Sequence, residues 1–177
     1  MAKVVLVVLV AMAAAAVVSA EEPPLEVVES VDLDRYLGTW YEIASYPAWF
    51  QRGCTAVTAE YSLRDDGLIR VVNSCNKGSL DGKLKQSTGR AKVVDGSNNA
   101  KLKVSFFGPF WGDYWIVDLD PKYRWAVVGV PSRKYLWILS RTRSMDEALY
   151  QEIVGRLQAN GYDKARLVRT LQPAAEE

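Results

Sequence analysis

The chain of 177 residues contains no histidine and only two cysteines, Cys54 and Cys75. Without histidine, the sequence lacks the side chain that most often acts as a general base and as a ligand of zinc or haem. Two cysteines are also too few for a metal site built from four thiolates. The sequence therefore predicts no metal, no cofactor and no catalytic residue, and an enzyme that acts on a lipid or pigment is kept only as an alternative.

An excess of charge of either sign is also absent, since 22 basic and 21 acidic side chains give a net charge of +1. A surface that binds nucleic acid needs clustered lysine and arginine, so we expect no nucleic-acid partner. Hydrophobic residues make up 49% of the chain and charged residues 24%, which is typical of a folded domain. A chain of this length is long enough to bury the core of one domain.

One long apolar run occurs in the sequence, between residues 4 and 18, directly after the basic Lys3. It is shorter than the roughly 20 residues that span a bilayer, and Val18-Ser19-Ala20 fits a cleavage site. We expect an exported protein, periplasmic or secreted, with a retained anchor as the alternative. No cysteine stands at the cleavage point, so no bacterial lipid anchor is predicted. The predicted divisions are a signal peptide at 1–20, an N-terminal lead at 21–30, a folded domain at 31–173 and a tail at 174–177.

Short segments with strand character fill most of the predicted domain. The segment 101–107 alternates cleanly, because Lys101 and Lys103 occupy one face and Leu102 and Val104 the other. Turn sequences such as Asp65-Asp66-Gly67 separate the segments. The pattern predicts an all-β fold, an eight-stranded antiparallel up-and-down barrel. The eight predicted strands are 39–45, 55–63, 68–74, 86–94, 101–107, 114–119, 123–130 and 135–141.

One helix is expected after the eighth strand. Ser144 with Glu147 three residues later fits a capping box, which predicts that the helix starts at Ser144. An apolar stripe with helical spacing follows, and Asn160-Gly161 provides a C-terminal cap. We expect this α-helix to flank the outside of the barrel, and a short strand at 167–171 to end the domain.

Three motifs occur in an order that resembles the lipocalin family. Gly38-Thr39-Trp40 is similar to its G-x-W motif, Asp118–Tyr123 to its second motif, and Arg141 to its third. Longer stretches are similar to the branch with the bacterial outer-membrane lipocalin, the plant temperature-induced lipocalins and apolipoprotein D. The resemblance implies that Gly38, Trp40 and Arg141 form the closed end of the barrel, with the Arg141 guanidinium on the Trp40 indole face.

The resemblance also implies storage or transport of a small hydrophobic ligand, a fatty acid or lysophospholipid in the bacterial relative. Charged residues cannot face an apolar lumen cheaply, so alternation assigns the inward side chains independently. Resemblance to apolipoprotein D adds Trp137 and Tyr114. The partner of the Asn73 amide stays open between Tyr61, a backbone group and a ligand head group. The predicted pocket contains Tyr61, Val71, Asn73, Leu102, Val104, Phe106, Tyr114 and Trp137.

Export to an oxidising compartment predicts a disulfide between Cys54 and Cys75, which lie at opposite ends of one hairpin around the turn at Asp65-Asp66-Gly67. Their positions do not pair in ideal register, so the hairpin needs a bulge or an offset pairing. The aromatic side chains Tyr46, Trp49 and Phe50 of the first long loop are expected at the mouth of the barrel or in a homodimer contact. A barrel filled by its own aromatic side chains, which would serve as an interaction module, and a peripheral membrane contact remain alternatives.

Overall fold

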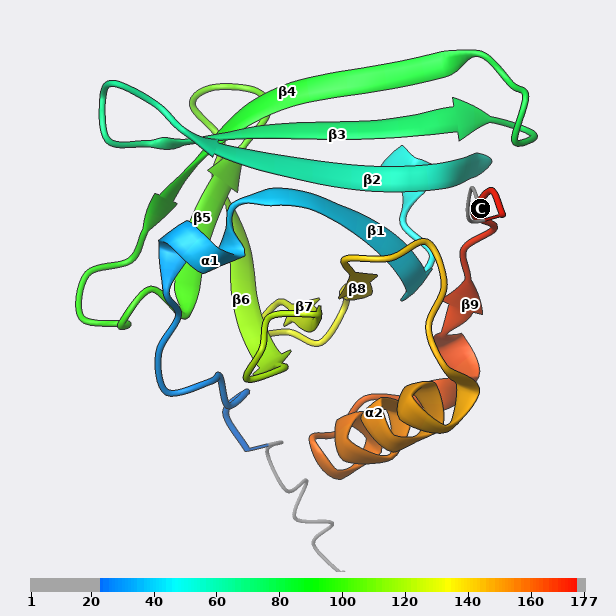
Figure 1. Ribbon diagram of the computed structural model, residues 1–177. Coiled ribbons are helices and arrows are strands. Elements are labelled where there is room, and N and C mark those ends of the chain that lie inside the picture. Colours follow the sequence, from blue (N-terminus) through cyan, green and yellow to red (C-terminus); the bar gives the residue numbers. More distant parts are fainter. Residues whose placement is uncertain (1–22, 175–177) are drawn as a thin grey trace, which may run out of the picture.

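The computed structural model describes residues 23–174, so the predicted signal peptide at 1–20 lies outside the described residues. Nine strands and two α-helices make up the described chain (Figure 1), together with two short 3-10 helices. The elements are α1 (Leu33–Tyr36), β1 (Gly38–Ser45), η1 (Trp49–Gln51), β2 (Cys54–Leu63), β3 (Ile69–Lys77), β4 (Leu84–Val93), β5 (Lys101–Ser105), β6 (Gly112–Leu119), β7 (Trp125–Gly129), β8 (Leu136–Ser140), α2 (Glu147–Ala159), η2 (Lys164–Arg166) and β9 (Val168–Arg169).

The first eight strands form a closed antiparallel barrel, which confirms the predicted fold class. Each strand from β2 to β7 pairs with the next one along the chain, so that β2 to β8 form a continuous sheet. Strand β1 closes the cylinder, because it pairs with β2 through Gly38–Tyr41 and with β8 through Tyr41–Ser45. The short strand β9 then pairs with the end of β1, beyond the point where β1 leaves β2.

The barrel wall has apolar side chains on both faces along β7, where all five residues are buried. Ala126 and Val128 belong to the cluster inside the barrel, whereas Trp125 and Val127 belong to the cluster outside it. The outer cluster includes Tyr150, Ile153, Val154 and Leu157 of α2. Because α2 packs on the outer wall (Figure 1), residues that would otherwise face water are apolar there, and period-two alternation disappears.

The start of α2 differs from the prediction, because its N-cap is Asp146 and not Ser144. The Asp146 carboxylate accepts a hydrogen bond from the Leu149 backbone N–H at 3.0 Å, as an N-cap does. Glu147 is consequently the first residue of the helix rather than the third, and its side chain accepts from Gln151 at 2.7 Å. The predicted end is confirmed, since α2 ends at Ala159 with Asn160 as its C-cap, and Gly161 follows with φ of +82°.

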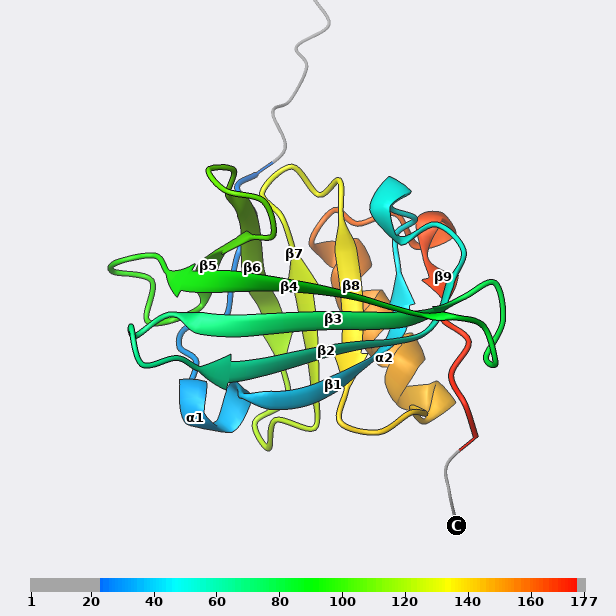
Figure 2. The same cartoon turned by 90° about the horizontal axis from the view of Figure 1, so that it is seen from above.

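The two ends of the barrel are built differently. Helix α1 covers the end at which β1 begins, and we call this the closed end (Figure 1). The open end carries the loops at 46–53, 78–83, 106–111 and 130–135, because each of them joins strands that reach this end. Figure 2 shows η1 and the loops before β6 and β8 on the same side of the barrel.

Arg141 ties together the segments that meet at the closed end. Its guanidinium lies 3.8 Å from the centroid of the Trp40 ring, which is fully buried. It also donates to the carbonyls of Thr39 at 2.8 Å, Arg35 at 2.7 Å and Leu37 at 2.9 Å. Gly38 has φ of +90°, a backbone conformation that a residue with a Cβ adopts only with strain.

The predicted disulfide between Cys54 and Cys75 is confirmed, with a Cα–Cα distance of 5.4 Å. The expected irregularity is present as well, since the β2–β3 register shifts between Thr55 and Thr58. Ala56 in this bulge has φ of +49°. The disulfide therefore joins the start of β2 to the end of β3 at the open end, and it fits an extracytoplasmic location.

Replacing Arg141 with lysine should lower the free energy of unfolding by about 2 kcal/mol, because lysine keeps the charge but loses the planar fork that reaches several carbonyls. Urea denaturation measures the loss. The control is Arg90→Lys, since Arg90 is exposed and its guanidinium lies 5.3 Å from the Trp111 ring. Equal losses in the two variants would show that Arg141 does not hold the closed end together.

Replacing both cysteines with serine should lower the free energy of unfolding by about 3 kcal/mol, because the unfolded chain gains the freedom that the bridge removes. A reductant should lower the urea midpoint of the parent protein toward that of the double variant and leave the variant unchanged. A parent whose midpoint stays the same after both thiols have become alkylatable would contradict this expectation.

Candidate functional site

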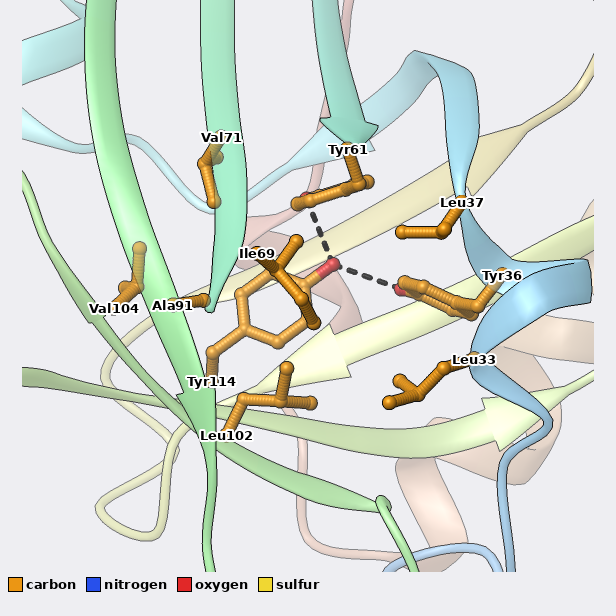
Figure 3. A pocket seen from close by; sticks show the side chains of 10 residues that line it. All are labelled: Leu33, Tyr36, Leu37, Tyr61, Ile69, Val71, Ala91, Leu102, Val104 and Tyr114. Atoms are coloured by element: carbon orange, nitrogen blue, oxygen red, sulfur yellow. Dashed lines mark hydrogen bonds between the residues drawn. The ribbon is translucent and has the colours of Figure 1, made fainter. Parts of the chain in front are cut away.

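A small internal cavity lies at the closed end of the barrel (Figure 3). Its volume is about 10 Å³, which is close to the minimum for a single water molecule. The cavity cannot hold an acyl chain, so a ligand would need the part of the barrel nearer the open end. The lining residues are Leu33, Tyr36, Leu37, Tyr61, Ile69, Val71, Ala91, Leu102, Val104 and Tyr114.

Three tyrosine hydroxyls meet beside this cavity, and Figure 3 shows Tyr114 between the other two. The Tyr114 oxygen lies 2.8 Å from the Tyr36 oxygen and 2.8 Å from the Tyr61 oxygen. The triad thus has three hydroxyl protons but makes only two hydrogen bonds. Whichever way the protons point, one proton finds no acceptor within the triad, and it is available to a water or to a polar atom of a ligand.

The environment of the triad keeps the hydroxyls protonated. Burial is the largest influence on all three, and it raises the pKa of Tyr61 to about 12. Burial also holds the pKa of Tyr36 and of Tyr114 well above the usual range. At neutral pH the triad therefore acts as a hydrogen-bond donor, and it carries no negative charge of its own.

The residues predicted to bind a ligand divide between the two halves of the barrel. Five of the eight, Tyr61, Val71, Leu102, Val104 and Tyr114, line the cavity at the closed end. Phe106 and Trp137 pack partly buried against the cluster inside the barrel without lining that cavity. These positions fit a ligand site, and their contact with a ligand remains a prediction.

Asn73 is exposed, although it lies on the same face of β3 as the buried Val71 and Cys75. It pairs with Ala59 on β2 and with Ser87 on β4. The Tyr61 hydroxyl lies 2.8 Å from the Tyr114 hydroxyl, which is its hydrogen-bond partner in the triad. The exposure of Asn73 indicates that the inner face is wet at this level, so its amide can be satisfied by water.

Aromatic rings border the inner face toward the open end. Phe106 packs against Gly89, where an added Cβ would lie 2.8 Å from the Phe106 ring and 2.6 Å from the Ser105 carbonyl oxygen. Trp137 stacks on Tyr135 with ring centroids 5.9 Å apart, and its indole N–H donates to Gln51 Oε1 at 3.2 Å. Gln51 thereby connects the loop over the mouth to the inner wall of the barrel.

Glu42 is an inward carboxylate that is not among the predicted site residues. It lies opposite the inward Leu139 in the β1–β8 register, and its side chain is 3% exposed. It accepts from the Ser45 hydroxyl at 2.9 Å, from the Gln51 amide and from the Thr170 hydroxyl. Burial raises the pKa of Glu42 and these hydrogen bonds oppose the rise. Extending the alternation from Trp40 by two residues would have placed it inside.

A groove of about 600 Å³ lies beside the mouth, between the loop after β1 and the C-terminal segment. Glu42, Trp49 and Thr170 are among its lining residues. Trp49 and Phe50 of this loop are exposed, as expected for side chains at the mouth. The prediction that Tyr46 lies at the mouth or in a homodimer contact is wrong. Tyr46 is buried in the cluster outside the barrel, and its hydroxyl donates to the Asp163 carbonyl at 2.8 Å.

No group of three or more histidine, cysteine, aspartate or glutamate side chains is placed to hold a metal ion within residues 23–174. In the same part of the chain, no helix has the length and apolar character needed to cross a membrane.

Comparison with known proteins matches residues 31–172 to the family model described as a lipocalin-like domain. The chain is 44% identical over 159 residues to the outer membrane lipoprotein Blc of Escherichia coli, covering 89% of each chain. It is 41% identical over 160 residues to temperature-induced lipocalin-1 of Arabidopsis thaliana, covering 86% of this chain and 85% of that protein. It is 34% identical over 158 residues to apolipoprotein D of Mus musculus, covering 85% and 80% respectively.

Among solved structures, insecticyanin from the tobacco hornworm Manduca sexta has a similar fold, with a TM-score of 0.68. The superposition covers 87% of this chain and 86% of that chain at 20% sequence identity. This likeness supports the barrel architecture alone.

The triad predicts unequal effects of removing its hydroxyls. Tyr114→Phe leaves the Tyr36 and Tyr61 hydroxyls buried without a partner, so it should cost about 3 kcal/mol in the free energy of unfolding. Tyr61→Phe leaves the Tyr36–Tyr114 bond intact and should cost about 1 kcal/mol. Urea denaturation of both variants tests this order, and a loss in Tyr61→Phe as large as that in Tyr114→Phe would contradict it.

Proposed function

Because this chain belongs to the lipocalin family, we propose that it binds and carries a single-chain lipid, a fatty acid or a lysophospholipid, in the open half of its barrel. The observation that carries the proposal is the gradient along the inner face. Trp40, Tyr61 and Leu102 are buried toward the closed end, whereas Phe106 and Trp137 remain partly exposed toward the open end. An apolar wall that is accessible from one end is the usual form of a small-molecule site.

The free energy gained by burying an acyl chain in this lumen is larger than the cost of association. A chain of about fourteen carbons contributes roughly 11 kcal/mol at about 0.8 kcal/mol for each methylene. Association costs at least about 4 kcal/mol, so micromolar affinity is the expected range. Methylene groups discriminate poorly between ligands, and the polar groups at hand are few, so we expect broad selectivity for chain length.

Binding without chemistry fits the residues better than catalysis does. Members of the family are mainly binding proteins. Both cysteines are committed to the disulfide, so neither offers a thiolate. The inward Glu42 carboxylate is surrounded by three donors and is placed as a structural acceptor. We further propose a periplasmic or secreted location, which the disulfide and the resemblance to an outer membrane lipoprotein support.

A second candidate is an interaction module whose barrel is filled by its own side chains. The small volume at the closed end, about 10 Å³, favours this candidate, because Tyr36, Tyr61 and Tyr114 occupy the space that a ligand would take. The two candidates differ in the lumen between Tyr114 and the open end. A carrier must have room there for an acyl chain, whereas a filled barrel has none.

Lysolipid binding should change the fluorescence of Trp137, since a chain in the open half would lie against its ring. We expect a saturable signal at micromolar lysophosphatidylcholine in the delipidated parent and a much smaller one in Trp137→Phe. The control is Trp125→Phe, because Trp125 lies in the cluster outside the barrel. Six tryptophans contribute to the emission, so the comparison of the two variants carries the result.

A charge inside the lumen supplies the second test. Phe106→Glu should abolish lysolipid binding, because a carboxylate there must be neutralised or keep the lumen wet. Phe107→Glu is the matched control, since this neighbouring ring is exposed. If neither a fatty acid nor a lysophospholipid gives a saturable response in the delipidated parent, the carrier proposal fails and the interaction module replaces it.

A further inference from the structure

Large exposed hydrophobic side chains are concentrated at one end of the molecule. Trp49 is 77% exposed, Phe107 78% and Phe110 76%, and all three lie in loops of the open end. Of the eight such side chains in residues 23–174, only Leu63, 64% exposed, lies at the closed end. The other exposed side chains at the open end are Phe50, Leu84, Val168 and Leu171.

Folded turns hold these rings outward. The Phe110 backbone N–H donates to the Phe107 carbonyl at 3.0 Å, which fixes the turn between β5 and β6. On the other loop, the Gln51 N–H donates to the Ala48 carbonyl at 3.0 Å, and the Gln51 side chain is held by Glu42 and Trp137. The exposure of Trp49 and Phe107 is therefore built into the loops, and the rings form a rim around the mouth.

Charge is distributed along the barrel in the same direction. Segment 163–166 lies beside the 130–135 loop, because Arg166 donates to the Lys134 carbonyl at 3.2 Å. The open-end segments 46–53, 77–85, 106–113, 130–135 and 163–166 together carry eight basic and three acidic side chains. The closed-end segments 29–37, 63–68, 94–100, 118–124 and 141–147 carry six basic and ten acidic side chains. The protein is nearly neutral as a whole, yet its open end is positive and its closed end is negative.

We propose that the open end docks on the surface of an anionic lipid bilayer. Aromatic rings favour the level of the lipid head groups, and lysine and arginine are attracted to anionic lipids at that surface. The aromatic rim formed by Trp49, Phe107 and Phe110 and the basic side chains around it supply both interactions on one face. The same face holds the mouth of the barrel, so a docked protein would receive a lipid without passing it through water.

The charge distribution also argues against a second copy as the partner of this face. Two open ends that met head to head would bring sixteen basic and six acidic side chains together, counted from the same segments. Like charges at close range oppose such a contact, especially at low salt. An anionic membrane presents the complementary charge over the whole face.

Sedimentation with lipid vesicles tests the docking directly. The full protein should bind vesicles of phosphatidylcholine mixed with phosphatidylglycerol, bind pure phosphatidylcholine weakly, and be released by high salt. The variant with Phe107→Ser and Phe110→Ser should lose at least about tenfold in partitioning, because both rings leave the interface. Leu63→Ser is the matched control, since it removes an exposed apolar side chain from the closed end.

Charge reversal adds an independent comparison. Lys83→Glu at the open end should reduce vesicle partitioning by roughly fivefold or more, because the variant loses a positive charge and gains a negative one. Lys122→Glu at the closed end should leave partitioning unchanged. Equal effects of the two reversals, or no preference for anionic vesicles, would overturn the proposal. If the parent forms a dimer and does not bind vesicles, and the variant with Phe107→Ser and Phe110→Ser is a monomer, the face serves self-association instead.

The docking proposal and the carrier proposal fail separately. All of these variants lie outside the lumen, so they should bind lysophosphatidylcholine in solution as the parent does. Loss of vesicle binding with retained lysolipid binding supports docking as a distinct property of the rim. Vesicle binding by a protein that takes up no lysolipid would support docking and reject the carrier.

Discussion

Closure of the sheet depends on β1, which pairs with β2 along its first half and with β8 along its second half. Beyond Tyr41 the two neighbours of β1 diverge, and the wall needs a further element there. Residues 168–172 supply it, because β9 pairs with β1, the Ala56 N–H donates to the Leu171 carbonyl at 2.7 Å, and the Gln172 amide donates to carbonyls of β1 and β2. Glu42 lies on β1 where the pairing with β2 ends, and its carboxylate accepts hydrogen bonds from Ser45, Gln51 and Thr170.

The closed barrel has one blocked end and one open end. At the closed end, Arg141 fills the hydrogen-bonding capacity of several carbonyls and covers Trp40, and the tyrosine triad occupies the space above. At the open end, the inner wall is aromatic and partly wet, and the loops around it present rings and positive charge. The proposed direction of ligand entry, the proposed depth of a bound chain and the proposed membrane-facing end therefore all depend on one asymmetry.

The parts of this arrangement that the sequence predicts are those in which a local pattern has a single physical meaning. On β5, Lys101 and Lys103 alternate with Leu102 and Val104, and only the two apolar side chains can face the lumen. The inward face of β5 was therefore predicted correctly. Along β7 and β8 both faces are apolar because α2 covers the outside, and alternation carries no information there. Tyr36 was missed because it lies on α1, a four-residue helix with no periodic signal. The capping residue of α2 was misplaced because Ser144 and Asp146 both suit the role, and the spacing of a capping box from Ser144 to Glu147 favoured the wrong one.

The most direct test of the account is mass spectrometry of the protein purified from its natural host under native conditions, followed by extraction of whatever it holds. The account predicts one single-chain lipid for each barrel, released on denaturation and absent from a Phe106→Glu variant prepared in parallel. An empty barrel in protein that was never exposed to detergent, together with no uptake of fatty acid or lysophospholipid added afterwards, would contradict it.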